Sequence, residues 1–156
     1  MVKQLDAYCG LYCGACFVMK ANETGRGEEL ASQWNLEPED VYCNGCKSGT
    51  LFINCRGCQL RECAVARNVS FCYQCQDYPC KDFSAFTKAK PHIIEVIENL
   101  EYIKQYGRVK WLETQEKRWS CANCGEKYSW YDQVCDNCGE KLEGYEEPVK
   151  KHYSRE

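Results

Sequence analysis

The sequence predicts a small, metal-stabilised α+β protein, in which irregular zinc knuckles and short helices precede a C-terminal zinc-ribbon hairpin. Three observations lead to this fold class. The 156-residue chain contains 15 cysteines, a fraction typical of disulfide scaffolds and of metal-binding proteins. Twelve of these cysteines form six C-x2-C pairs. Residues 91–107 carry the apolar period of an amphipathic helix.

The cysteine pattern favours metal sites over disulfides. An odd number of cysteines does not fit a closed disulfide framework. Thiols two residues apart are good chelating pairs and poor disulfide partners. The N-terminus, "MVKQLDAYCG", shows no apolar signal-peptide region. We therefore expect a cytoplasmic protein with reduced thiols.

Charge and hydropathy limit the classes of partner. The formal net charge is -3, and four thiolates around one zinc ion would add further negative charge. This balance argues against nucleic acid as a partner. No apolar run reaches the length of a membrane span. We therefore expect the partner to be a protein, which the sequence does not identify.

Helical signals divide the chain into segments. Residues 28–34 and a stretch starting at Pro38 predict short helices. The 91–107 helix is expected to bury Ile93, Val96, Ile97, Leu100 and Ile103, and a following helix over 108–119 to bury Val109, Leu112 and Trp119. The predicted domains are a cysteine-rich metal-binding domain (5–90), a helical connector packing on it (91–118), a zinc ribbon (119–142) and a mobile tail (143–156).

The most specific metal signal is C-terminal. Cys121, Cys124, Cys135 and Cys138 have the spacing C-x2-C-x10-C-x2-C, and a glycine follows each pair. Four thiolates on two turns form a closed tetrahedral site, the common pattern of structural zinc. Iron would fit the same ligands. The aromatic residues between the pairs are expected to pack the hairpin, with stacking on bases as the alternative.

A short internal repeat lies upstream. "CRGCQLREC" (55–63) and "CYQCQDYPC" (72–80) share the pattern C-x2-C-Q-x3-C, so that Cys55, Cys58 and Cys63 correspond to Cys72, Cys75 and Cys80. The last cysteine of each copy precedes a helix-compatible stretch. This position predicts two thiols at helix starts, where the helix dipole favours a thiolate.

The chain also resembles a known family. "CGLYCGAC" (9–16), "CNGC" (43–46), "CRGCQLRECAVARN" (55–68) and "CYQCQDYPC" (72–80) resemble the DUF3795 family of small cysteine-rich proteins over residues 5–85. The resemblance implies metal binding and a cytoplasmic setting. It implies no particular reaction.

Several groupings of the eleven N-terminal cysteines are open. One joins Cys55 and Cys58 with Cys72 and Cys75, joins Cys43 and Cys46 with Cys63 and Cys80, and leaves Cys9, Cys13 and Cys16. A second joins Cys13 and Cys16 with Cys43 and Cys46. A third completes a mixed site with His92.

The sequence is compatible with three functions. The first is a structural protein with two to three Zn²⁺ ions that acts as an adaptor. The second is an iron–sulfur redox protein that uses Cys9, Cys13 and Cys16, since three thiolates leave a cluster position open. The third is a nucleic-acid-binding ribbon. An enzyme is disfavoured, because the chain is too short for a (β/α) barrel and has only two histidines.

Overall fold

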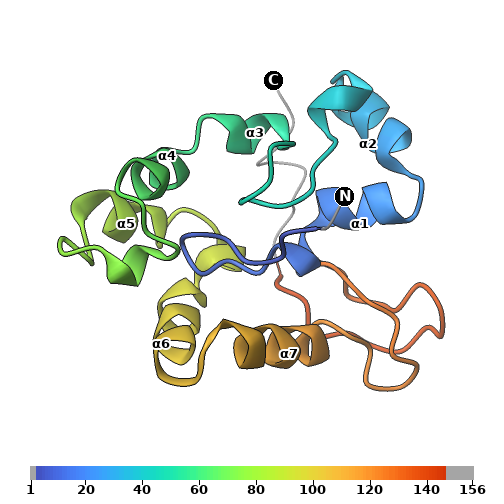
Figure 1. Ribbon diagram of the computed structural model, residues 1–156. Coiled ribbons are helices and arrows are strands. Elements are labelled where there is room, and N and C mark those ends of the chain that lie inside the picture. Colours follow the sequence, from blue (N-terminus) through green and yellow to red (C-terminus); the bar gives the residue numbers. More distant parts are fainter. Residues whose placement is uncertain (1–2, 147–156) are drawn as a thin grey trace.

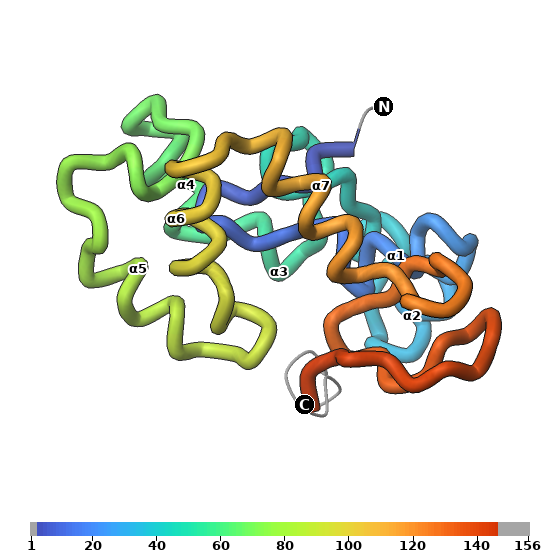
Figure 2. The backbone as a smooth tube through the Cα atoms, turned by 90° about the horizontal axis from the view of Figure 1, so that it is seen from below, coloured from blue at the N-terminus to red at the C-terminus, as the bar shows by residue number. Residues whose placement is uncertain are grey.

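An N-terminal strap, residues 3–16, runs through the middle of the molecule, and helices from the rest of the chain surround it (Figure 1). The computed structural model describes residues 3–146. Seen from below, α6 and α7 cross the strap on one side (Figure 2). The described part of the chain is mostly helical or irregular.

The helices are short. The α-helices are α1 (Phe17–Glu23), α2 (Gly27–Trp34), α3 (Ile53–Arg56), α4 (Gln59–Ala66), α5 (Lys81–Phe86), α6 (Val96–Tyr106) and α7 (Arg108–Arg118). The 3-10 turns are η1 (Cys13–Ala15), η2 (Pro38–Asp40), η3 (Cys72–Gln74) and η4 (Pro91–Ile93). The predicted helices near residue 28 and Pro38 correspond to α2 and η2.

The expected β component is reduced to three isolated bridges within residues 3–146: Asp6 with Tyr12, Ser120 with Lys127, and Val134 with Lys141. The segment between the two C-terminal cysteine pairs does not extend this pairing. Its residues 129–132 form a turn, in which the Ser129 N–H donates to the Asp132 carboxylate (2.8 Å) and the Asp132 N–H donates to the Ser129 carbonyl. Each bridge closes its own cysteine turn, and the turn at 129–132 lies between them. The two strands of the predicted hairpin therefore do not form.

The strap fits against α6 through a glycine. Gly10 has φ +89°, and a Cβ there would lie 2.8 Å from Leu100 Cγ and 2.9 Å from the Val96 carbonyl oxygen. Both distances are shorter than a real Cβ contact, so only glycine allows this approach. The buried Asn99 amide donates to the Gly10 carbonyl (2.9 Å). The strap is therefore held against α6 by packing and by a buried hydrogen bond.

The inward faces of α6 and α7 differ in part from the predicted ones. Ile93, Val96, Leu100 and Ile103 are buried as predicted. The prediction for Ile97 is wrong, since it is 48% exposed, and so is that for Val109, which is 67% exposed.

The error in α7 arises because its inward face is set by a residue outside the predicted set. Trp111 is buried and meets the Tyr12 ring edge to face (6.0 Å between centroids). Gln115 and Trp119 follow at intervals of four on the same face and are also buried. Val109 is two residues from Trp111 and so lies on the opposite side of the helix.

The Asp6 carboxylate joins three distant segments. It is 1% exposed and accepts hydrogen bonds from Lys47 Nζ (2.6 Å) and from Arg108 Nη2 (2.7 Å). Burial alone would raise the pKa of Asp6, but the hydrogen bonds and positive charges of Arg108 and Lys47 outweigh it and lower the pKa below the ordinary value of 3.8. Asp6 is therefore charged at neutral pH and fixes both cations.

Contacts also join the C-terminal residues to the rest. The Trp130 N–H donates to the Ala15 carbonyl (3.0 Å), and the Tyr145 N–H donates to the Trp130 carbonyl (2.6 Å). Of the predicted mobile tail, residues 147–156 lie outside the described residues. No helix in the described residues is long and apolar enough to cross a membrane.

We expect Asp6→Asn to lower the free energy of unfolding by about 2 to 3 kcal/mol, because it leaves the partly buried Lys47 without its counter-ion. Urea unfolding at pH 7 measures this difference. The lowered pKa of Asp6 stabilises the fold above pH 3.8, and the stabilisation is lost as the pH falls through that lowered pKa. The difference in the free energy of unfolding between the wild type and Asp6→Asn should therefore become smaller below pH 3.8.

The matched control is Asp40→Asn. Asp40 pairs with Arg56 (2.8 Å) at the surface, where the Arg56 side chain is 47% exposed, so its loss should change stability by less than about 1 kcal/mol. Equal effects of the two substitutions would contradict the role given to Asp6.

Candidate metal centre

Four cysteines at the C-terminal end form a cluster with the dimensions of a mononuclear metal site. The Sγ atoms of this C-terminal cysteine cluster lie within 4.8 Å of one another, with Cys121 and Cys138 at 3.7 Å and Cys124 and Cys135 at 3.5 Å. Within residues 3–146 it is the only group of three or more candidate ligands whose ligand atoms lie this close together. Four thiols in this arrangement could bind one metal ion.

Two turns of the same construction present the four thiols. In the first, the Cys121 N–H donates to the Glu126 carbonyl and the Gly125 N–H to the Cys121 carbonyl (both 2.8 Å). In the second, Cys135, Gly139 and Glu140 repeat the pattern at 2.8 and 2.9 Å. Each turn closes with one antiparallel bridge. The cluster is thus built from two equivalent halves.

The local environment favours a thiolate at Cys124. Two hydrogen bonds lower the pKa of the Cys124 thiol to about 6. The larger effect comes from the Asn137 side chain and the second from the Glu126 backbone N–H. Metals bind the thiolate form of cysteine. This preference for a thiolate does not extend to the neighbouring Cys135, because the pKa of its thiol is raised to about 11: its backbone hydrogen bond from Cys138 lowers the pKa, but burial and the hydrogen bonds with Cys124 and Cys138 outweigh it.

Trp130 anchors the C-terminal module, residues 119–146, to the N-terminal half. Its ring lies parallel to the His92 imidazole (4.2 Å between centroids) and meets the edge of Phe17 (5.9 Å). Lys20 of α1 pairs with Asp132 (2.7 Å) and Asp136 (3.1 Å) of the module. The cluster therefore sits on a module that is fixed to α1 and η4.

His92 packs against the C-terminal module. Its Nδ1 is hydrogen-bonded to the Tyr131 hydroxyl (2.8 Å) and its ring stacks on Trp130, so these two contacts link η4 to aromatic residues of that module. Tyr128 and Trp130 are buried, which agrees with the packing role expected for these aromatic residues. Sequence reasoning did not find the link between His92 and Trp130, because it joins side chains that are far apart in the chain.

The strap thiols lie beside the 43–46 loop. Burial raises the pKa of the Cys46 thiol, and the backbone N–H of Tyr8 in the strap lowers it in part. Burial, followed by repulsion from Cys46, raises the pKa of the Cys13 thiol well above 9.0. Burial also raises the pKa of the Cys16 thiol to about 12, and repulsion from Cys43 adds to this effect. Cys13 and Cys16 thus lie near Cys46 and Cys43, and Cys55 lies near Cys16 and Cys43 as well. The second grouping stays a prediction.

A glycine allows the strap and this loop to meet. Gly45 has φ +101°, and a Cβ on it would collide with the Gln4 carbonyl. The Gln4 N–H donates to the Asn44 carbonyl at 2.8 Å. Cys9 is buried next to the same loop, and the charge of Cys46 contributes to its raised pKa after burial itself. The three strap cysteines therefore have other cysteines as neighbours, and the iron–sulfur role of Cys9, Cys13 and Cys16 stays a prediction.

The two copies of the repeat fold differently. In the second copy, Cys80 caps the start of α5 and its sulfur accepts from the Phe83 N–H (3.4 Å), as predicted. In the first copy the prediction is wrong, because α4 already begins at Gln59 and Cys63 lies inside it. Pro79 explains the difference, since proline is incompatible with a helix interior and delays the second helix until after Cys80.

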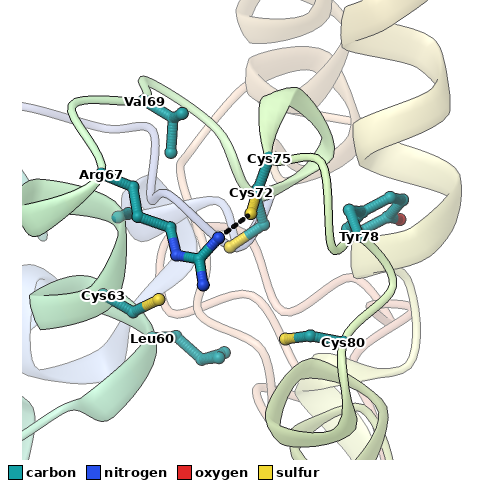
Figure 3. A pocket seen from close by; sticks show the side chains of 9 residues that line it. Leu60, Cys63, Arg67, Val69, Cys72, Cys75, Tyr78 and Cys80 are labelled. Atoms are coloured by element: carbon teal, nitrogen blue, oxygen red, sulfur yellow. Dashed lines mark hydrogen bonds between the residues drawn. The ribbon is translucent and has the colours of Figure 1, made fainter.

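This asymmetry brings four cysteines of the repeat to one cavity. We call Cys63, Cys72, Cys75 and Cys80 the thiol pocket (Figure 3). Cys58 precedes α4 as its N-cap. Cys55 in α3 is exposed as a residue, but it does not line this cavity, and its thiol lies near Cys16 and Cys43, since burial and their charges raise its pKa. The first grouping, which paired Cys55 and Cys58 with Cys72 and Cys75, differs from this arrangement. None of the fifteen cysteines forms a disulfide in residues 3–146.

The fold and the site define a small, mostly helical, cysteine-rich protein with a four-cysteine cluster that could hold a metal ion. The chain belongs to the DUF3795 family, described as a protein of unknown function, whose profile matches residues 5–85. The match covers slightly more than half of the chain and ends before the C-terminal cysteine cluster. No curated protein and no solved structure matches the chain.

Each cysteine turn depends on a glycine in the left-handed region, with φ +78° at Gly125 and +76° at Gly139. A side chain in this conformation is unfavourable by about 1 to 2 kcal/mol. We expect Gly125→Ala and Gly139→Ala each to weaken metal binding by roughly 5- to 30-fold, measured by competition with a chromophoric chelator. Gly49→Ala is the control, because Gly49 has open space around it and no such φ. Unchanged affinity in both cluster variants would contradict this role.

Proposed function

We propose that the protein is a zinc-binding protein in which the C-terminal cysteine cluster is a zinc ribbon with a structural Zn²⁺ ion. The sulfur spacing supports this most directly. A tetrahedral zinc ion with Zn–S bonds of about 2.3 Å requires sulfur atoms about 3.8 Å apart. The two short Sγ–Sγ distances, 3.5 and 3.7 Å, are close to this value.

Four protein ligands support a structural ion over a catalytic one. Catalytic zinc keeps one coordination position for water or substrate, whereas a tetrathiolate site is closed. The ion would connect the turn at 121–124 with the turn at 135–138. The intervening Trp130 would then remain in place against His92 and Phe17. In this proposal, zinc secures the C-terminal module on the N-terminal half.

A closed zinc site supports an adaptor in preference to an enzyme, and two further features argue against a nucleic-acid-binding protein. The aromatic side chains that could stack on bases include the buried Tyr128 and Trp130. The net charge of -3 becomes more negative when thiolates bind zinc. A reducing, cytoplasmic setting fits fifteen unpaired thiols. The partner in this proposal is a protein.

Metal analysis of Cys124→Ala tests the zinc site. The Cys124 side chain is exposed, so the substitution removes a ligand without opening a core cavity. We expect the variant to lose one zinc equivalent per chain and to become more sensitive to trypsin at Lys127 and Lys141, since the two turns are no longer connected.

Val134→Ala is the control, because Val134 is exposed in the same module and offers no ligand atom. It should retain the zinc and the protease resistance of the wild type. Two results would contradict the proposal: full zinc content in Cys124→Ala, or a red protein with one iron atom in place of this zinc, since the same four thiolates also accept iron.

A further inference from the structure

The thiol pocket collects four cysteines from three separate elements. Cys63 comes from α4, Cys72 and Cys75 from η3 and its C-cap, and Cys80 from the N-cap of α5. All four line one cavity. In Figure 3 the sulfur atoms of Cys63 and Cys80 face each other across this cavity, with those of Cys72 and Cys75 above. Convergence of four thiols is the ligand arrangement of a metal centre.

The pocket is wider than the C-terminal cysteine cluster. No three of its sulfur atoms lie within 4.8 Å of one another, because that condition is met in residues 3–146 by the C-terminal set alone. Between the side chains there is a cavity of about 30 Å³. One zinc ion could not reach all four sulfur atoms at about 2.3 Å without closure of the pocket.

The side chains that line the pocket suit a negatively charged cluster of several metal ions. Leu60, Ala64, Val69 and Tyr78 supply apolar surface around the sulfur atoms. The Arg67 guanidinium donates to Cys75 Sγ (3.1 Å) and is itself paired with Asp77 (2.7 Å). Hydrogen bonds to the sulfurs and nearby charge are what tune an iron–sulfur centre.

We propose that Cys63, Cys72, Cys75 and Cys80 ligate an iron–sulfur cluster. Such clusters take four cysteine thiolates, and their irons and inorganic sulfides occupy the space that a single ion leaves empty. This centre is separate from the zinc site of the proposed function and does not depend on it. The chain would then carry two metal centres of different kinds.

Cys63→Ala is the variant that tests the cluster. Cys63 is exposed within α4, where alanine is the most favourable helix residue, so the fold should be kept. The full chain is purified without oxygen and reconstituted with ferrous iron and sulfide. We expect the wild type to take up iron and acid-labile sulfide with visible absorption, and Cys63→Ala to lose the iron of one cluster, two or four atoms per chain.

Val65→Ala, at an exposed position of the same helix, should retain the wild-type iron content, and circular dichroism confirms the fold of both variants. Cys121→Ala should retain the cluster and lose zinc, which separates a failure of this inference from a failure of the zinc proposal. Absence of iron uptake by the wild type would overturn the inference. So would loss of one zinc, and no iron, in Cys63→Ala.

Arg67→Gln provides a readout that a purely structural pocket would not give. A cluster with four thiolates is negative and becomes more negative on reduction, so a nearby cation favours the reduced state. Removal of the Arg67 charge should shift the reduction potential to a more negative value while the iron content stays the same. A potential equal to that of the wild type would contradict the placement of the cluster beside Arg67.

Discussion

The buried Asp6 carboxylate is the interaction on which the arrangement of the chain depends. A charge removed from water is tolerated only when it is paired, and Asp6 pairs with Lys47 and Arg108, which lie 41 and 102 residues further along the chain. These pairs fix the strap between the 43–46 loop and α7. The strap in turn contacts α6 through Gly10 and the C-terminal module through Ala15. The strap therefore positions the 43–46 loop, α6 and the C-terminal module relative to one another.

The described cysteines occupy environments with different sulfur spacing. In the C-terminal cysteine cluster all four sulfur atoms lie within 4.8 Å of one another, and two pairs, at 3.5 and 3.7 Å, are close to the edge length of a tetrahedron around one ion. In the thiol pocket they surround a cavity with apolar walls and a neighbouring guanidinium. The ligand type is the same in both, so cysteine chemistry alone does not distinguish them. The spacing and the surrounding side chains do, and they are the basis for proposing zinc in one centre and an iron–sulfur cluster in the other.

Local patterns in the sequence predicted the parts that depend on local physics. The spacing of Cys121, Cys124, Cys135 and Cys138 was sufficient to place four thiols together, because two short turns of one type determine their geometry. The apolar period identified α6. It failed at Ile97 and Val109, because which side of each helix is inward depends on the packing of Leu100 and Trp111 against the strap.

The grouping of the N-terminal cysteines could not be derived from spacing. It follows from tertiary contacts, such as the fit of Gly45 against Gln4, that spacing does not encode. It also follows from the different folding of two similar repeats. One proline moves the second helix start, so that Cys63 lies within a helix and Cys80 at the beginning of one. A repeat in sequence therefore produced one asymmetric pocket.

Two chemically different metal centres in one small chain can be distinguished by anomalous X-ray diffraction from crystals of anaerobically prepared protein, recorded at the zinc and iron absorption edges. We expect a zinc peak within the C-terminal cysteine cluster and an iron peak within the thiol pocket. Zinc peaks at both positions, or an iron peak at the C-terminal cluster, would contradict it.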